Sequence, residues 1–305
     1  MLSKQIIALS GLIAVTIASP FTHNVAPNNM PTVLVSNPSS QKVTSTTAFT
    51  NGAGNNNNQN TTDGIGAGKD VYNCYSGSFQ DFPAKSKWIS FTDMWNNAQS
   101  ALKESCSNIE STGPGDSAAQ ITDILSSIQQ VADTSLADHR FIFATIMQES
   151  SGCVNVETSK NPDPTQPDNP SFAATTAFTS TQPVSDPKEF CSLEFLTDNG
   201  HRGLMQSAGG SSFVGNSASA AAQAASITQM IIDGTQGTAK GDGLVQCINQ
   251  YGNIYEAARC YNSGTVDPSD LNNGEGATSS YVNDIANRMT GWLNANNGES
   301  GFGSC

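Results

Sequence analysis

The sequence predicts a mainly α-helical fold, and two observations support this prediction. First, apolar residues recur at helical spacing in several stretches. The clearest series is Ile121, Ile124, Leu125, Ile128 and Val131, which places one apolar stripe along a single helix. Second, residues that cap helices precede several such stretches, and glycines follow some of them.

Six of the expected helices follow from these signals. We expect a helix across 88–102 with Ser90 as its cap, a second around 121–131, and four after Gln206. The last four span 220–233, 243–251 capped by Asp242, 254–261 capped by Asn253, and 281–293 capped by Thr278 or Ser279.

A further helix ends in a single carboxylate. The stretch Phe141–Gly152 runs apolar, and Ser135 with Asp138 approximates a capping box before it. Gly152 can end the helix in a left-handed conformation, which places Glu149 in the last turn. Apolar neighbours and unpaired carbonyls there both raise a carboxyl pKa. A carboxylic acid that keeps its proton near neutrality is suited to general acid catalysis.

Four short motifs occur in a fixed order along the chain. They are Glu149-Ser150, the G-L-M-Q stretch 203–206, the A-x-x-Y-N-x-G stretch 258–264, and the Y-x-N-D stretch 281–284. Together, over roughly 117–292, they resemble the goose-type lysozyme and soluble lytic transglycosylase group of the lysozyme-like superfamily. The layout is most similar to secreted fungal members. The resemblance implies an α+β lysozyme-like fold, mainly helical, in which a small hairpin and loop region forms a glycan cleft.

The resemblance assigns the catalytic residues. Glu149 matches the general acid. Asp198 resembles an aspartate upstream of G-L-M-Q that positions the attacking water, although its spacing differs by about one residue. The second family carboxylate, just after G-L-M-Q, is replaced by Ser207 and Ala208. Inverting hydrolysis needs such a base, whereas a lytic transglycosylase uses the sugar's own hydroxyl. Asp198 therefore favours hydrolysis and leaves transglycosylation open.

Six further residues are expected to bind substrate. Gln206, Tyr261 and Asn262 match family cleft positions, and their amides and phenol can hold acetamido and hydroxyl groups. Tyr281 resembles the tyrosine that faces the glutamate. Ser150 completes the E-S motif, and His201 directly precedes G-L-M-Q.

The domain organisation follows from composition. Lys4, an apolar run from 6 to 17 and small residues after it predict a signal peptide at 1–18. Residues 19–70 are rich in Asn, Thr, Ser, Pro and Gly, so we expect a disordered leader, as the run Asn55–Asn58 illustrates. The catalytic domain is expected at 71–305. Its proline-rich part, about 154–198, is interpreted as an inserted loop.

Cysteine content and charge restrict the environment and the partners. Seven cysteines after a signal peptide indicate disulfides and no metal site. Cys247 can pair with Cys260, and Cys153 can pair with Cys106 or Cys191. The net charge of -13 argues against binding nucleic acid or anionic membranes. The chain has no H-E-x-x-H, phosphate-loop or G-x-S-x-G motif, so we expect no cofactor. We also expect a monomer.

These interpretations converge on a secreted glycoside hydrolase that cuts β-1,4 bonds in N-acetylated cell-wall glycans. Peptidoglycan is the first expected substrate and a chitin-type polymer the second. The alternatives are a lytic transglycosylase and a non-catalytic glycan-binding or effector protein that kept the fold.

Overall fold

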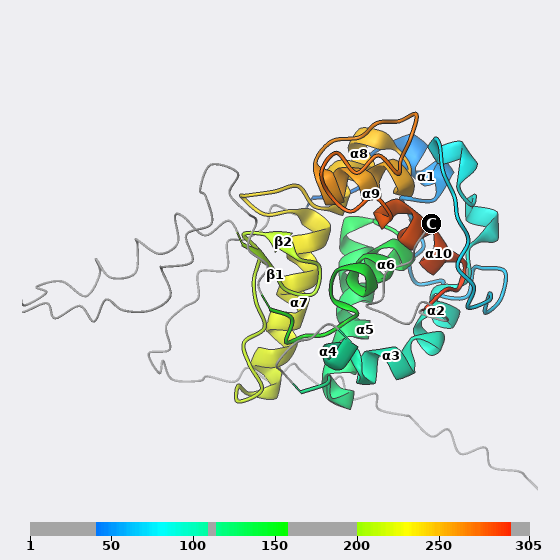
Figure 1. Cartoon of the computed structure of the whole chain (residues 1–305). Helices are drawn as coiled ribbons and strands as arrows, with labels where there is room; N and C mark the ends of the chain where they lie inside the picture. Colours follow the sequence, from blue (N-terminus) through cyan, green and yellow to red (C-terminus); the bar gives the residue numbers. More distant parts are fainter. Residues whose placement is uncertain (1–40, 109–113, 158–199, 294–305) are drawn as a thin grey trace, which may run out of the picture. The chain divides into compact units, whose positions relative to one another are not determined.

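The computed structural model describes residues 41–108, 114–157 and 200–293, and these residues form a mainly helical fold (Figure 1). The predicted signal peptide, residues 19–40 of the predicted leader and residues 158–198 of the predicted insertion lie outside the described residues. Within the described residues, the one sheet is an antiparallel pair of short strands, β1 His201–Arg202 and β2 Ser207–Ala208.

The helices agree with the predicted series in their order and extend it, but several details of the prediction are wrong. The bounds are α1 Thr46–Asn51, α2 Phe91–Asn97, α3 Gln99–Lys103, α4 Ser105–Asn108, α5 Ala118–Ser135, α6 His139–Ser150, α7 Ala220–Gln236, α8 Leu244–Tyr251, α9 Ile254–Ser263 and α10 Tyr281–Thr290. Two short 3₁₀ helices, η1 Phe79–Asp81 and η2 Lys85–Lys87, precede α2. The single helix expected across 88–102 is divided into α2 and α3, the N-cap residue of α8 is Gly243 in place of Asp242, and that of α10 is Ser280 in place of Thr278 or Ser279.

Helix α6 lies at the centre of the packing. Figure 1 shows it between α5 and α10, and it also contacts α2. Eleven of its twelve residues are buried, and the exception is Glu149. An apolar helix surrounded by other helices loses its solvent-facing side, which explains why its sequence is apolar around most of its circumference. The packing thus leaves Glu149 as the residue of this helix that is only partly buried.

Local capping explains where the helices begin. Ser90 caps α2, Ser117 caps α5 and Asn253 caps α9, each by accepting a hydrogen bond from a backbone N–H of the first turn. The predicted start of α6 is wrong: Asp138 caps it, while Ser135 is the last residue of α5. A sharp corner at Leu136, with a φ of 61°, separates the two helices.

Between described residues, two disulfides join elements that are neighbours in space. Cys247 of α8 is bonded to Cys260 of α9, as one prediction stated. Cys106 of α4 is bonded to Cys153, three residues after the end of α6, which selects one of the two predicted pairings for Cys153. Such bonds form and persist in an oxidising environment.

The prediction of a disordered leader is wrong for residues 41–70. Val43, Ala48 and Ala53 are buried, and α1 packs against α8. In the asparagine run, the side chains of Asn55 and Asn58 are buried as well. The prediction was wrong because it relied on the small number of apolar groups in the composition. Buried side-chain amides in this segment bond to backbone groups and help to attach it to the rest of the fold.

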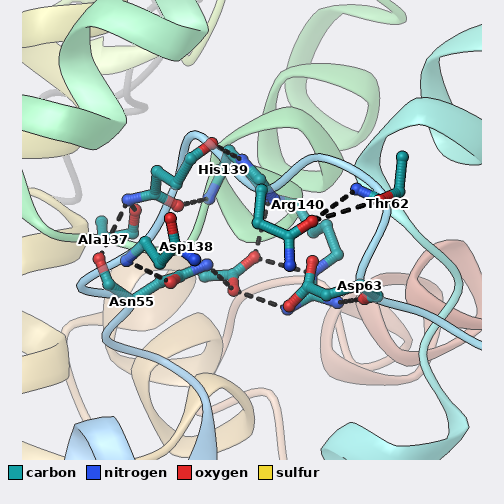
Figure 2. A network of polar contacts seen from close by, with 10 residues as sticks. Asn55, Thr62, Asp63, Ala137, Asp138, His139 and Arg140 are labelled. Carbon is teal, nitrogen blue, oxygen red and sulfur yellow. Dashed lines mark hydrogen bonds and ion pairs between the residues drawn. The ribbon is translucent and has the colours of Figure 1, made fainter.

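Buried polar contacts attach this segment to the α5–α6 corner (Figure 2). Asn58 Nδ2 donates to the carbonyls of Ala132 and Ala137, at 2.9 and 3.0 Å. Arg140 donates to Asp138 from Nε at 2.8 Å and from Nη2 at 2.7 Å, and from Nη1 to the Asp63 carbonyl at 2.8 Å. Burial alone would raise the pKa of Asp138, but Arg140 outweighs it and holds that pKa below its usual value.

Among the described residues, the structure contains no helix that combines the length and the apolar character needed to cross a bilayer.

Candidate active site around Glu149

Glu149 occupies the last turn of α6, where the helix ends in an abrupt turn. Ser151 and Gly152 follow with φ values of 53° and 86°. Gly152 has the predicted left-handed conformation, but Ser151 is the C-cap residue. The disulfide at Cys153 fixes the chain directly after this turn. The carboxylate therefore extends from a rigid helix whose end is covalently attached to α4.

Tyr281, the first residue of α10, contacts the carboxyl of Glu149 directly. Its phenol donates a hydrogen bond of 2.5 Å to Oε1 of Glu149. Burial raises the pKa of Glu149 to about 7, and the hydrogen bond from Tyr281 acts in the opposite direction. Burial, together with the negative charge of Glu149, raises the pKa of Tyr281 well above its usual value, so the phenol keeps its proton. The predicted contact between these two residues is present.

Tyr261 brings the G-L-M-Q stretch to the same place. Its phenol donates to the carbonyl of Met205 at 2.7 Å. The preceding carbonyl, that of Leu204, accepts from Ser150, the neighbour of Glu149, so the stretch 203–206 connects the two helix ends. Burial raises the pKa of Tyr261 above its usual value, and the charge of Glu149 adds to this effect. Glu149, Tyr261 and Tyr281 thus come from three helices and form one cluster.

Ser150 links the end of α6 to the same stretch. Its hydroxyl donates to the carbonyl of Leu204 at 2.8 Å and to that of Ile146 at 3.1 Å, and the residue is fully buried. This burial argues against the predicted direct contact with substrate. The position of Ser150 instead explains how the loop at 203–206 is held against α6.

Gln206 and His201 lie in the small hairpin. Gln206 has a φ of 46° and donates from Nε2 to the carbonyl of Gly203 at 3.1 Å, inside the turn between β1 and β2. His201 pairs with Ala208 across the two strands and is partly exposed. These two predicted residues therefore both lie in the hairpin that carries Met205.

Asn262 is oriented by Arg259, a residue that the sequence did not single out. Arg259 Nη1 donates to Oδ1 of Asn262 at 2.8 Å. Because a guanidinium only donates, this contact fixes which side of the amide is the oxygen and turns the NH₂ group away from Arg259. Arg259 is itself fully buried, and its other donors bond to backbone carbonyls of Leu271, Thr278 and Ser279. The sequence signal for this role was Arg259 itself, a cationic residue inside the A-x-x-Y-N-x-G motif.

A second contact between α6 and α10 was also missed. Gln148 Nε2 donates to Asp284 Oδ2 at 3.0 Å, and Gln148 Oε1 accepts from Arg288 Nε at 3.0 Å. Both Asp284 and Arg288 of α10 thus bond to the residue next to Glu149.

The second predicted catalytic residue, Asp198, lies outside the described residues. The hydrogen bonds that the structure gives for Glu149, Tyr261 and Tyr281 involve no second carboxylate. Asp233 of α7, whose charge acts on Tyr261, accepts hydrogen bonds from Ser211 N and Gln229 Nε2.

Two other features of the described residues are a cysteine–aspartate group and a pocket. Cys106, Asp116 and Cys153 are close enough to hold a metal ion, but the two sulfurs are joined in a disulfide and offer no thiolates. A pocket beside α6 lies away from Glu149. It is lined by Ile89, Met94, Asn97, Phe143, Ala144, Met147, Arg288, Gly291, Trp292 and Leu293.

No protein-family model matches this sequence, and no curated protein or solved structure is similar enough to give a match.

Proposed function

We propose that this protein is a secreted lysozyme-like glycosidase that cleaves β-1,4 bonds in N-acetylated cell-wall glycans, with Glu149 as its general acid. Peptidoglycan is the first proposed substrate and a chitin-type polymer the second. One observation carries the proposal: a carboxyl with a pKa of about 7 ends a buried helix and accepts a 2.5 Å hydrogen bond from a tyrosine.

The proposed chemistry follows from this pair. Glycoside cleavage requires a proton on the leaving oxygen as an oxocarbenium-like centre develops. A carboxyl with a pKa near 7 holds that proton at neutral pH and releases it to a developing alkoxide. Once the proton has left, the hydrogen bond from Tyr281 stabilises the carboxylate. Tyr281 is thus proposed to lower the barrier to proton donation.

The surrounding polar groups support a sugar substrate. Asn262 has its oxygen bonded to Arg259, so its NH₂ group is the side available to a ligand carbonyl such as an acetamido oxygen. Gln206 and His201 are proposed to line the same cleft from the hairpin. The net charge of -13 makes a neutral or cationic glycan easier to approach than an anionic envelope.

The environment fits extracellular action. The disulfides Cys106–Cys153 and Cys247–Cys260 indicate an oxidising compartment. The apolar run at 6–17 supports export through a signal peptide, which we propose is cleaved after residue 18.

A Glu149→Gln variant tests the proposal. It should reduce cleavage of peptidoglycan or chitooligosaccharides by at least about 10²-fold while the protein stays folded. The matched control is Glu104→Gln, which removes an exposed carboxylate and should leave turnover unchanged. Equal turnover in Glu149→Gln and wild type would refute the assignment. Tight oligosaccharide binding without any cleavage by the wild type would favour the glycan-binding alternative.

Lytic transglycosylation is the second candidate, and one observation favours it. The bonds described around Glu149 include no second carboxylate, and Ser207 and Ala208 occupy the positions after G-L-M-Q. Mass spectrometry of the products separates the two reactions, since hydrolysis leaves reducing ends and transglycosylation leaves anhydro ends. If Asp198 activates water, Asp198→Asn should slow hydrolysis by roughly 10²–10⁴-fold. A transglycosylase should tolerate the change much better.

A further inference from the structure

Neighbouring residues of α6 make hydrogen bonds to α10. Glu149 accepts from Tyr281, the first residue of α10. Gln148, the residue before Glu149, bonds to Asp284 and Arg288, about one and two turns further along α10. The contacts of Gln148 and of Glu149 therefore join the same two helices.

Both ends of the Gln148 amide are bonded to charged groups. Its NH₂ group donates to Asp284 Oδ2, and its oxygen accepts from Arg288 Nε, each at 3.0 Å. A carboxylate only accepts and a guanidinium only donates, so the orientation of the amide is unambiguous. All three side chains are buried. Hydrogen bonds between buried charged groups and an amide are stronger and more directional than exposed ones.

Asp284 extends this contact to the start of α10. Its Oδ2 also accepts a 3.0 Å hydrogen bond from the hydroxyl of Ser280, the residue before Tyr281. Its Oδ1 accepts from the phenol of Tyr72 at 2.7 Å. The ring of Tyr72 packs edge-on against Trp292, whose ring also lies under the guanidinium of Arg288. Asp284 therefore bonds both to Gln148 on α6 and to Ser280, the N-cap residue of α10, which directly precedes Tyr281.

We propose that Gln148 is a positioning residue which, through Asp284, sets the hydrogen bond between Tyr281 and Glu149. The role of this bond in catalysis rests on the proposed function. Gln148 is buried and bonds within the protein, so it acts on Glu149 through α10 and not through substrate.

The ionisable groups around Glu149 define what else can affect its titration. Those of α2 and α5, Asp93, Asp123 and Asp133, are partly or fully exposed. In the part of the chain that the structure describes, further ionisable groups lie on three helices. They are Tyr281, Asp284 and Arg288 on α10, Tyr261 and Arg259 on α9, and Asp233 on α7. Tyr72 contacts one of these groups, Asp284. His139 and Arg140 lie in the first turn of α6, at the opposite end from Glu149. The hydrogen bond from Tyr281 lowers the pKa of Glu149, so weakening it should raise that pKa.

The test is a direct titration of Glu149 by NMR, with ¹³C in the glutamate side-chain carboxyls and the signal assigned by its loss in Glu149→Gln. In Tyr281→Phe, the midpoint should rise by about one pH unit, the effect expected from losing a hydrogen bond to a charged group. Gln148→Met should raise it in the same direction. The double variant should show no further rise, because both changes act on one hydrogen bond.

Gln120→Met is the matched control. Gln120 is also buried and bonded at both ends of its amide, to Ser117 N and Asn216 Oδ1. This variant should lose stability without moving the Glu149 midpoint. If Gln148→Met does not fold, Ser280→Ala should give the same upward shift, because it removes the hydroxyl that joins Asp284 to the start of α10 and changes no charge.

An unchanged midpoint in a folded Gln148→Met or Ser280→Ala variant would overturn the inference, as would additive shifts in the double variant. The titration needs no substrate. Correct shifts in a protein that cleaves no glycan would therefore uphold the positioning role and refute the proposed function.

Discussion

The hydroxyl of Ser150 donates a 2.8 Å hydrogen bond to the carbonyl of Leu204, which lies 54 residues further along the chain. Both residues are fully buried. This bond ties the end of the helix that carries Glu149 to the loop whose next carbonyl, that of Met205, accepts from Tyr261. The relative placement of Glu149 and Tyr261 thus depends on a serine that is itself shielded from solvent.

Ser150→Ala should lower the free energy of unfolding by about 1–3 kcal/mol, because it leaves the buried Leu204 carbonyl without this donor. It should also lower kcat more than it raises KM if the loop positions catalytic groups. Denaturant unfolding and steady-state kinetics check the two parts. The control is Ser126→Ala, which removes an exposed hydroxyl from α5. Equal stability in the two variants would contradict the role given to Ser150.

Activity should depend on the protonation of Glu149. Its pKa of about 7 is raised above the ordinary carboxyl value, so the proton-bearing form predominates below that pH and is lost above it. For a general acid, kcat/KM should therefore fall about tenfold per pH unit well above the pKa. A pH profile of oligosaccharide cleavage measures this. A rate that stays constant across that range would argue against Glu149 as the proton donor.

The asparagine run supplies a comparison between neighbouring side chains. Asn58→Ala should lower the free energy of unfolding by about 2–4 kcal/mol, because the buried amide bonds to backbone groups of Asn55, Ala132, Ala137 and His139. Asn56 is exposed, and Asn56→Ala should change stability by less than about 0.5 kcal/mol. Urea unfolding of both variants checks this. Two small, equal effects would mean that the segment 41–70 adds little to stability.

Stability should fall as Asp116 ionises. Burial raises the pKa of Asp116 to about 7 from an ordinary value of 3.8, despite a hydrogen bond from the backbone N–H of Val154. A raised folded-state pKa means that the folded protein binds this proton more tightly than the unfolded chain does. The contribution of Asp116 to stability is therefore most favourable below the unfolded pKa and is lost as pH rises through the folded pKa.

Asp116→Asn should remove this loss, because an amide oxygen can still accept from Val154 and carries no charge. Above pH 7 the variant should be more stable than wild type by on the order of 2–4 kcal/mol, and the gap should close at low pH. Thermal unfolding across the pH range measures it. The control is Asp242→Asn, which changes an exposed aspartate. A difference in stability between Asp116→Asn and the wild type that does not vary with pH would contradict the role given to the ionisation of Asp116.

Much of the site was predictable because its signals are local or follow a motif order. The apolar stretch before Glu149 indicated a buried helix, and the order of the four motifs indicated that Tyr281 faces Glu149. The connection of Gln148 to α10 was not predictable. A glutamine in an apolar helix gives no sign of its partner, since the partner depends on how two helices pack.

The sequence by itself determined where most helices lie, because capping and periodicity act over a few residues. It also contained the carboxylate at the end of an apolar helix. Only the tertiary structure decided which polar residues are buried. Asn55 and Asn58 are buried, whereas Asn56 and Asn57 between them are exposed. Asn58 is buried because it bonds to partners that lie 74 to 81 residues further along the chain. No local sequence pattern indicates which asparagine will meet such distant partners.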